Sequence, residues 1–365
     1  MGLGGNEAGG RKLDDGFLMD KTIAIIGAGP AGSMLAAKLA SDANKVCLFD
    51  PKAPWEKPCG GMLGSDTIDA HPELKNYPYP INQCHEMVYI SPRNDRTKVP
   101  AQTAIPIISR LELSCYLLDM AKNSSAAFIP KKVLNISQDQ SRWVIETEDS
   151  AYIADLIVGA DGANSMVRKA TIGNFPEQHL SLTCGYILTG VPEDQYITKF
   201  LDIPGYIWVF SRANHTSTGI GATLGTVSGK DLFKKLHDFL SENYPGFRIT
   251  KKYSALIAAV ADERFFDQPC SGDNWLLVGE AAGHVDPVTG EGIHYAFGSA
   301  KAAAQAIGAD DIHSYEDLWR DQYGDRLKQG AAAKQNLLIM GQDFGPEIIG
   351  AMMYFRAVRN FTDAR

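Results

Sequence analysis

The fold of this chain is decided by residues 21–32, which read KTIAIIGAGPAG. The apolar run 22–26 predicts a strand that is buried on both faces of a parallel sheet, and the Ala- and Leu-rich stretch that follows predicts a helix ending near residue 40. Between the two, glycines stand in the spacing GxGxxG at Gly27, Gly29 and Gly32. The first glycine permits a tight turn, the second lets the backbone approach a pyrophosphate, and the third lets helix and strand pack closely.

A second predicted strand, 46–49, ends at Asp50. A carboxylate at this place can accept hydrogen bonds from both ribose hydroxyls of an adenosine. The complete strand–turn–helix–strand unit predicts a dinucleotide site whose ligands include Gly27, Gly29, Ala31, Gly32 and Asp50. This unit alone does not distinguish NAD from FAD, and the alternative interpretation is a tight turn between core elements.

Two later segments narrow the choice of cofactor. Residues 159–162 read GADG and follow a predicted strand, although an Asp-Gly turn of no special function has the same sequence. Residues 278–293 read VGEAAGHVDPVTGEGI and lie between a predicted strand at 274–278 and a predicted helix from Gly292 to about Ile307. Reduced flavin carries negative charge around N1 and O2, which a helix N-terminus at Gly292 would stabilise.

These segments resemble the "DG" and "GDAAG…P…GEG" signatures of flavin hydroxylases and their relatives. The resemblance implies that Glu280, which replaces the usual Asp, binds the ribityl chain of FAD, and that Arg110, at the start of a predicted helix 109–122, reaches the cofactor. It implies an FAD-binding set in this region of Arg110, Asp161, Gly162, Glu280, Pro287, Gly290, Gly292 and Ile293.

Two further motifs resemble one branch of these flavoproteins. Residues 57–61 read KPCGG, similar to a "CGG" segment at the face of the flavin, which adds Cys59, Gly60 and Gly61 to the expected cofactor ligands. Residues 204–211 read PGYIWVFS, similar to "PxxYxWxFP" except for Ser211. Over residues 21 to about 310, the chain is similar to the geranylgeranyl reductase family of p-hydroxybenzoate hydroxylase-like flavoproteins. The resemblance implies an α/β fold, with a Rossmann-type FAD-binding domain and an inserted antiparallel β-sheet substrate domain.

The residues expected to carry the chemistry are Cys59, Tyr206 and Trp208. In a strand, Tyr206, Trp208 and Phe210 project to one face. They form either an apolar wall for an isoprenoid tail or an ordinary core-facing surface. Cys59 is either a small residue that fits close to the flavin or a redox or proton-relay group.

The resemblance favours reduction of carbon–carbon double bonds in an isoprenoid or other apolar substrate, with FAD reduced by NAD(P)H or another donor. One alternative is an FAD-dependent aromatic monooxygenase, which would need O₂. A second alternative is a non-catalytic prenyl-binding carrier on the same fold.

The length of 365 residues indicates about two domains. We expect a flexible tail at 1–20 and C-terminal helices at 331–365. We expect the FAD-binding domain to be discontinuous and to use 21–80, 101–180 and 262–330. The substrate domain is then formed by 81–100 and by 181–261, a strand-rich region with one amphipathic helix at 232–240.

Composition excludes several function classes. A net charge of -8 argues against a nucleic-acid partner. The six cysteines have neither CxxC nor zinc-site spacing, so we expect no metal site and a reducing, cytoplasmic location. No apolar run reaches the roughly 18 residues of a membrane span. The C-terminal apolar runs 337–340 and 348–355 pack in the core, line the cavity mouth, or make peripheral membrane contact. The oligomeric state stays open.

Overall fold

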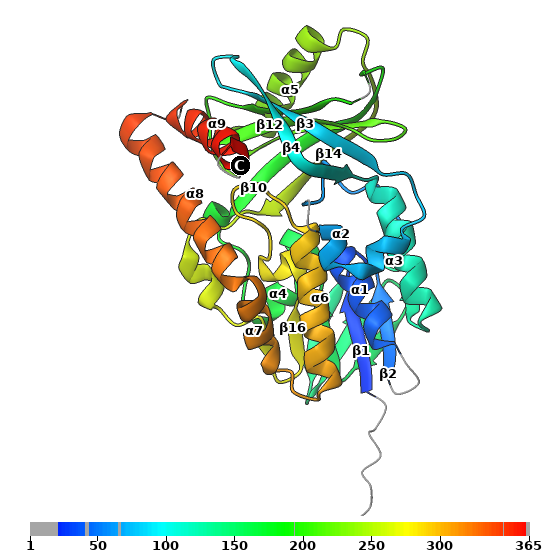
Figure 1. Ribbon diagram of the computed structural model, residues 1–365. Coiled ribbons are helices and arrows are strands. Elements are labelled where there is room, and N and C mark those ends of the chain that lie inside the picture. The colour runs from blue at the N-terminus through cyan, green and yellow to red at the C-terminus, as the bar shows by residue number, and fades with distance from the viewer. Residues whose placement is uncertain (1–20, 41–43, 65–66, 193, 346, 363–365) are drawn as a thin grey trace, which may run out of the picture.

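The computed structural model describes residues 21–362 except 41–43, 65–66, 193 and 346; the expected tail at 1–20 lies outside the described residues. Figure 1 shows two sheets stacked along the long axis of the molecule, one in the lower half and one in the upper half. The long helix α8 (Asp325–Phe344) runs along the side from the lower half to the upper half. The arrangement places the loops of the lower sheet against one face of the upper sheet.

The lower sheet has six strands in the order β15-β16-β9-β1-β2-β5. All neighbours pair in parallel except β15 and β16, which are antiparallel. The strands are β1 (Lys21–Ile26), β2 (Asn44–Phe49), β5 (Ala127–Ile129), β9 (Leu156–Gly159), β15 (Ser271–Gly272) and β16 (Trp275–Leu277). Ile23, Ala24 and Ile25 are almost fully buried, so β1 is covered on both faces as its continuous apolar run predicts.

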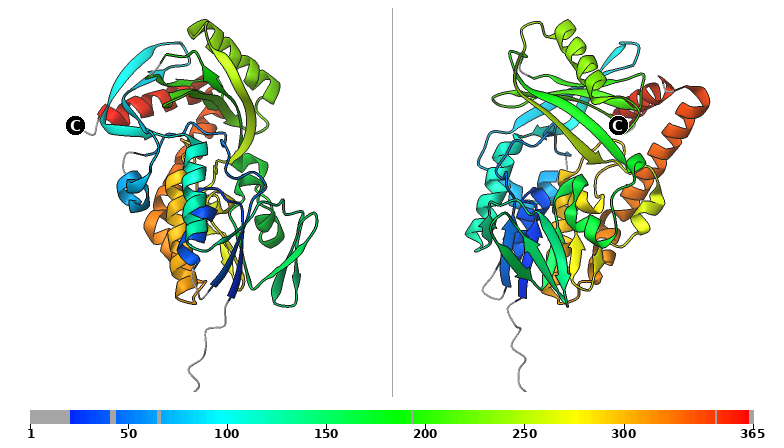
Figure 2. Two further views of the ribbon diagram at one scale, coloured as in Figure 1. Left: turned by 90° about the vertical axis from the view of Figure 1, so that its right-hand side faces the viewer. Right: turned by 180° about the vertical axis from the view of Figure 1, so that it is seen from behind.

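Helices and a small sheet cover the two faces of this parallel sheet (Figure 2). One face carries α1 (Pro30–Leu39), α3 (Arg110–Asn123) and α6 (Ile293–Gly308), which pack side by side. The other face carries a three-stranded antiparallel sheet of β6 (Asn135–Asp139), β7 (Arg142–Glu146) and β8 (Ala151–Ala154).

The upper sheet has seven strands in the order β14-β10-β13-β12-β11-β3-β4. They are β3 (Asn82–Ile90), β4 (Arg96–Ile107), β10 (Leu180–Thr189), β11 (Tyr196–Phe200), β12 (Gly205–Ser211), β13 (Thr216–Thr223) and β14 (Arg248–Ala258). All neighbours are antiparallel except β11 and β3. Because β4 continues to Ile107, this sheet extends beyond the boundary expected at 100.

Two helices cover opposite faces of the upper sheet. The amphipathic helix α5 (Gly229–Asn243) buries Leu232, Leu236 and Leu240 against one face. The C-terminal helix α9 (Glu347–Thr362) packs on the other face, against β3, β4 and β11. The fold class predicted from the sequence, a Rossmann-type domain with an inserted antiparallel sheet, is confirmed.

The remaining elements connect these layers. They are α2 (Thr67–Ala70), α4 (Met166–Thr171), α7 (Ser314–Trp319), α8 (Asp325–Phe344), a π-helix at Arg320–Gly324, and 3₁₀ turns at Pro72–Asn76, Gly162–Asn164, Glu177–His179, Glu263–Asp267 and Gly279–Ala282. Within the described part of the chain, every helix is too short or too polar to cross a membrane.

Candidate functional site

The three glycine-rich segments meet at one edge of the parallel sheet. They directly follow the carboxyl ends of β1, β9 and β16, which all point the same way. A Cβ placed on Gly27 would lie 2.5 Å from the Ala160 carbonyl oxygen, and one placed on Gly279 would lie 2.9 Å from Ala31 Cβ. Open α/β sheets bind their ligands at this edge.

The GxGxxG turn has the shape that its glycines predict. Gly27 has φ +102°, and a Cβ on Gly32 would lie only 1.9 Å from the Gly27 carbonyl oxygen. Around Gly29, by contrast, an added Cβ meets no described atom within 4 Å. Gly29 is also the N-cap of α1, and no side chain caps the first N–H groups there. Open space beside a helix N-terminus is suited to a phosphate group.

Asp50 lies at the carboxyl end of β2, beside this turn. Its Oδ2 accepts a hydrogen bond from the Ala28 N–H at 3.0 Å, and its Oδ1 accepts from the N–H groups of Lys52 and Ala53 at 2.7 and 3.0 Å. These bonds fix the carboxylate and occupy both lone pairs of Oδ1 but only one of the two on Oδ2. Oδ2 therefore keeps one position that could accept a ribose hydroxyl.

Asp161 and Glu280 lie on adjacent loops. Asp161 Oδ2 accepts the Met166 N–H at 2.7 Å, whereas its Oδ1 is buried without a hydrogen-bond partner in the described structure. Burial raises the pKa of the Asp161 carboxyl above its ordinary value. Glu280 forms an ion pair of 3.1 Å with Lys57, and its Oε2 lies 3.4 Å from a Cβ placed on Gly162. The structure thus brings all three loops together around these carboxylates.

The loop 284–292 leads into α6. Asp286 Oδ1 accepts the N–H groups of Val288 and Thr289 at 3.0 and 2.7 Å, which shapes the turn. Gly290 has φ +75°, and Gly292 is the N-cap of α6, again without a side-chain cap. Pro287 and Ile293, also expected at the cofactor, are packed against other parts of the protein. Ile293 is buried. The ring of Pro287 lies against α8, where a Cβ placed on Gly330 would be 2.7 Å from it.

The Cys59 loop has a backbone that requires glycine. Gly61 has φ +83°, and a Cβ there would lie 2.2 Å from the Ile108 carbonyl oxygen. The Gly61 N–H points to Cys59 Sγ at 3.4 Å, and the Gly61 carbonyl accepts the Ile108 N–H at 2.9 Å. The loop is therefore held against the end of β4, with the thiol near a backbone donor.

Positive charge surrounds this thiol. Arg110, the first residue of α3, is 6% exposed, and its Nε has no hydrogen-bond partner in the described structure. Burial raises the pKa of the Cys59 thiol, but the charge of Arg110, the Gly61 N–H and the charge of Arg212 outweigh it. The net pKa of Cys59 is lowered from its ordinary value.

The aromatic side chains of β12 face the Cys59 loop. Tyr206, Trp208 and Phe210 lie on one face, as the strand period predicts, and the two residues between them pack under α5. A Cβ on Gly60 would lie 2.6 Å from Phe210 Cδ2 and 3.5 Å from Trp208 Cδ1. The rings therefore lie between the upper sheet and the loops of the lower sheet.

The C-terminal helices complete this apolar face. Met353 and Tyr354 of α9 pack against the cluster that contains Trp208 and Phe210. Of the apolar C-terminal runs, Leu337 and Ile349 are buried, while Ile339 and Phe355 are exposed. The runs are thus divided between core packing and the surface.

Sequence reasoning missed two charged residues, Glu56 and Arg212. Arg212 lies between β12 and β13 with a side chain that is 1% exposed, and it forms an ion pair with Glu56, whose side chain is 12% exposed. Their only signal in the sequence is position: Glu56 directly precedes KPCGG, and Arg212 directly follows the aromatic motif.

The residues at this edge fit FAD. The open space at Gly29 and the uncapped N-terminus of α1 suit a pyrophosphate, and the uncapped N-terminus of α6 suits the flavin pyrimidine. The unpartnered Nε of Arg110 is a donor that a cofactor can satisfy. Among the described residues, no three His, Cys, Asp or Glu side chains cluster as metal ligands would.

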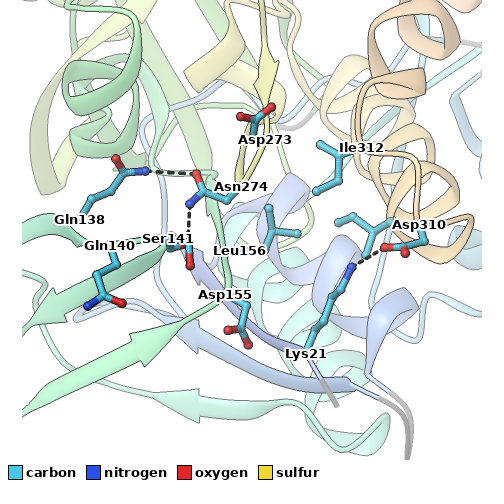
Figure 3. Close-up of a pocket in the computed structure, with 11 residues that line it drawn as sticks. Lys21, Gln138, Gln140, Ser141, Asp155, Leu156, Asp273, Asn274, Asp310 and Ile312 are labelled. Carbon is cyan, nitrogen blue, oxygen red and sulfur yellow. Dashed lines mark hydrogen bonds and ion pairs between the residues drawn. The ribbon is translucent and has the colours of Figure 1, made fainter. Parts of the chain in front are cut away.

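A separate pocket lies at the opposite edge of the parallel sheet (Figure 3). It is lined by the starts of β1 and β9, including Lys21 and Leu156, and by Asn274 before β16. Several of its polar groups bond to one another: Lys21 pairs with Asp310, and Asn274 Nδ2 donates to the Ser141 carbonyl at 2.9 Å. It contains none of the glycine-rich segments, so we place the functional site at the other edge.

Similarity to known proteins agrees with this geometry. The family model for an FAD binding domain matches residues 20–230. The chain is 24% identical over 350 residues to digeranylgeranylglycerophospholipid reductase 1 of Methanococcoides burtonii, covering 88% of this chain and 85% of the relative. It is 26% identical to geranylgeranyl diphosphate reductase of Synechocystis (83% and 81% covered) and 25% identical to menaquinone reductase of Mycobacterium tuberculosis (87% and 83% covered).

Solved structures share the fold. A geranylgeranyl bacteriochlorophyll reductase-like protein of Thermoplasma acidophilum superposes with a TM-score of 0.73 at 19% identity, covering 93% of this chain and 96% of the other. The p-nitrophenol 4-monooxygenase of Pseudomonas putida gives a TM-score of 0.69 at 15% identity, covering 94% and 95%. One architecture therefore accommodates proteins named as reductase-like and as monooxygenase.

Proposed function

From the premise that this chain belongs to the FAD binding domain family, we propose that it reduces carbon–carbon double bonds of an isoprenoid or other apolar substrate. It is an FAD-dependent oxidoreductase of the geranylgeranyl reductase-like group, and the predicted family resemblance is confirmed. The relatives named above carry the names of reductases that act on geranylgeranyl diphosphate, a digeranylgeranyl lipid and menaquinone, all with isoprenoid chains.

One observation carries the proposal: an aromatic face lies directly over the Cys59 loop. Trp208 and Phe210 approach Gly60, and α9 extends the apolar surface with Met353 and Tyr354. Each aromatic ring can bury about 150–250 Å². A wall of this kind suits a hydrocarbon chain, since a polar aromatic substrate would call for several directed hydrogen-bond donors.

Reduction of a double bond requires a source of hydride and a source of a proton. When bound, FAD accepts electrons from a donor such as NAD(P)H and supplies hydride to the substrate. An isolated alkene is a poor hydride acceptor, so a proton must reach the second carbon in the same step or before it. Cys59, with its thiol beside the Gly61 N–H, is the proton donor we favour.

Tyr206 is better suited to positioning. Its hydroxyl donates to the Thr289 carbonyl. A Cβ placed on Gly290 would lie 3.6 Å from the Tyr206 hydroxyl oxygen. Burial raises the pKa of the Tyr206 hydroxyl, and the neighbouring Cys59 and Asp286 raise it further. We propose that Tyr206 holds the Gly290 loop against the aromatic face.

The test is product analysis without oxygen. Purified FAD-loaded protein, reduced chemically or with NADPH, is incubated anaerobically with geranylgeranyl diphosphate, a geranylgeranyl glycerolipid and menaquinone. The expected product gains two hydrogens per reduced double bond, and FAD-free protein gives none. A product that forms only in air and gains oxygen would make the protein a monooxygenase. Binding of the chain without any redox change would make it a carrier.

A further inference from the structure

All three guanidinium nitrogens of Arg212 donate hydrogen bonds within the protein. Its Nη2 donates to the Cys59 carbonyl at 2.6 Å and its Nε to the Gly60 carbonyl at 3.3 Å. Its Nη1 donates to Glu56 Oε1 and lies 3.1 Å from His215 Nε2. A buried arginine that binds two successive loop carbonyls fixes that loop more rigidly than a single hydrogen bond can.

Glu56 ties this arginine to α3. Its carboxylate accepts the Ser109 hydroxyl at 3.1 Å and the N–H groups of Arg110 and Leu111 at 3.2 and 3.1 Å. It therefore caps the helix from which Arg110 reaches toward Cys59. Burial raises the pKa of Glu56, but the charge and hydrogen bonds of Arg212 lower it below its ordinary value. Glu56 is thus ionised under physiological conditions.

The Cys59 carbonyl has a second donor. The Ser217 hydroxyl donates to it at 2.7 Å from the start of β13. Together with Arg212, this bond holds the peptide carbonyl from the side of the upper sheet. The loop position is consequently defined by the substrate-side sheet, although the loop itself follows β2 of the parallel sheet.

We infer that Arg212 and Glu56 are a positioning pair: Arg212, held by Glu56, fixes the Cys59–Gly61 loop by its carbonyls and adds positive charge near the thiol, so that Cys59 exchanges a proton readily. The inference rests on the proposed function for its meaning in turnover. Its physical content is the protonation of Cys59, which can be measured without any substrate.

The charged and titratable groups facing this thiol come from four directions. Arg110 belongs to α3, Arg212 to the β12–β13 turn, Tyr206 to β12 and Tyr253 to β14, with Glu56 and His215 behind Arg212. Burial and the charge of Arg212 lower the pKa of His215, so this imidazole is neutral near neutral pH. The two arginines are then the charged groups that favour the thiolate, beside the Gly61 N–H.

The experiment is alkylation of Cys59 in the FAD-loaded protein with iodoacetamide, from about pH 5 to about pH 10, read by peptide mass spectrometry. Arg212→Gln should raise the apparent pKa of the thiol by about one unit and slow alkylation about tenfold below that pKa. Glu56→Gln removes the opposing charge and should accelerate it several-fold. Arg212→Lys keeps the charge and should restore the profile.

Two controls isolate the effect. Cys115 is half-buried on α3, where burial and the neighbouring Asp119 and Glu112 raise its pKa, so its alkylation should not respond. Arg264→Gln removes an arginine from an exposed ion pair with Asp262 and should leave Cys59 unchanged.

Opposite shifts for the two variants support the inference. A purely structural role would loosen the loop in both variants and speed alkylation in both, and that result would overturn it. An unchanged profile in Arg212→Gln would overturn it too. If Arg212→Gln does not fold, Arg212→Lys decides, because it loses the planar fork of donors but keeps the charge: unchanged alkylation supports the inference, and faster alkylation overturns it. If alkylation follows the expected pattern but the protein reduces no alkene, the proposed function is refuted and the inference about Arg212 and Glu56 stands.

Discussion

Replacing Gly29 by valine should remove FAD from the protein while leaving the fold intact. Gly29 has φ −73° and ψ −174°, an extended conformation that any residue adopts, and an added Cβ meets no described atom within 4 Å. A branched side chain at the N-cap of α1 should cost the apo-protein about 1 kcal/mol. The same side chain would occupy the space that we assign to the pyrophosphate.

The loss of cofactor affinity should be much larger than the loss of stability. Each hydrogen bond from a free backbone N–H to a charged phosphate contributes about 1.5–3 kcal/mol. Displacing the phosphate from two such donors therefore costs about 3–6 kcal/mol, or roughly 100- to 10,000-fold in Kd.

Three measurements check this prediction. Flavin absorbance per protein after gel filtration gives the FAD content, quenching of flavin fluorescence gives the Kd, and urea unfolding of the apo-protein gives its stability. Gly308→Val is the matched control, because Gly308 ends α6 and also faces open space. Normal FAD content in Gly29→Val would refute the assignment of the pyrophosphate. An unfolded apo-protein would refute the interpretation of the open space.

Glu280→Gln should weaken FAD retention, seen as a several-fold higher Kd, without changing the product; an altered product at normal FAD content would contradict the ribityl assignment. Glu73→Gln should reduce the free energy of unfolding by about 1 kcal/mol at pH 7. Partial burial raises the pKa of Glu73, but Lys38 and Lys301 lower it to about 2, so urea titrations should show this difference above about pH 4.5 and its loss as pH falls toward 2. Equal differences at pH 7 and pH 2 would disprove this linkage. Trp208→Phe removes the indole Nε1, which has no hydrogen-bond partner in the described structure. This variant should slow turnover of a long-chain alkene more than it weakens FAD binding. Equal effects on turnover and on FAD binding would argue against a substrate wall.

Periodicity predicted the elements that position the site. The apolar run of β1, the glycine spacing, and the alternation in β12 each depend on local chemistry, and the structure has all three. The extent of the upper sheet was harder to predict, because β4 contains Pro100 and Pro106, which normally argue against a strand. β4 is an edge strand, where a missing N–H is tolerated.

The charged pair behind the Cys59 loop could not be predicted from the sequence. Charged residues next to loops are mostly exposed, so nothing local to Glu56 or Arg212 indicates burial. Their burial follows from contact between segments more than 150 residues apart, which only the packing of the two sheets creates. Sequence motifs predicted the glycine-rich loops that meet at one edge of the parallel sheet because backbone shape is encoded locally, whereas the electrostatics of the thiol depend on tertiary contacts.

Alternate residues of β12 point to opposite faces of the upper sheet, so one strand contributes both to the packing under α5 and to the aromatic face over the Cys59 loop. Ile207 and Val209 are buried under α5, where they help to hold the upper sheet together. Trp208 and Phe210, one residue out of phase, face the Cys59 loop and α9. Because a strand cannot shift by one residue without exchanging its two faces, the packing under α5 also fixes which side chains face the Cys59 loop. The apolar wall is thereby held in register by residues on the other face of the sheet, and the residue directly after the same strand, Arg212, anchors the loop that the wall covers.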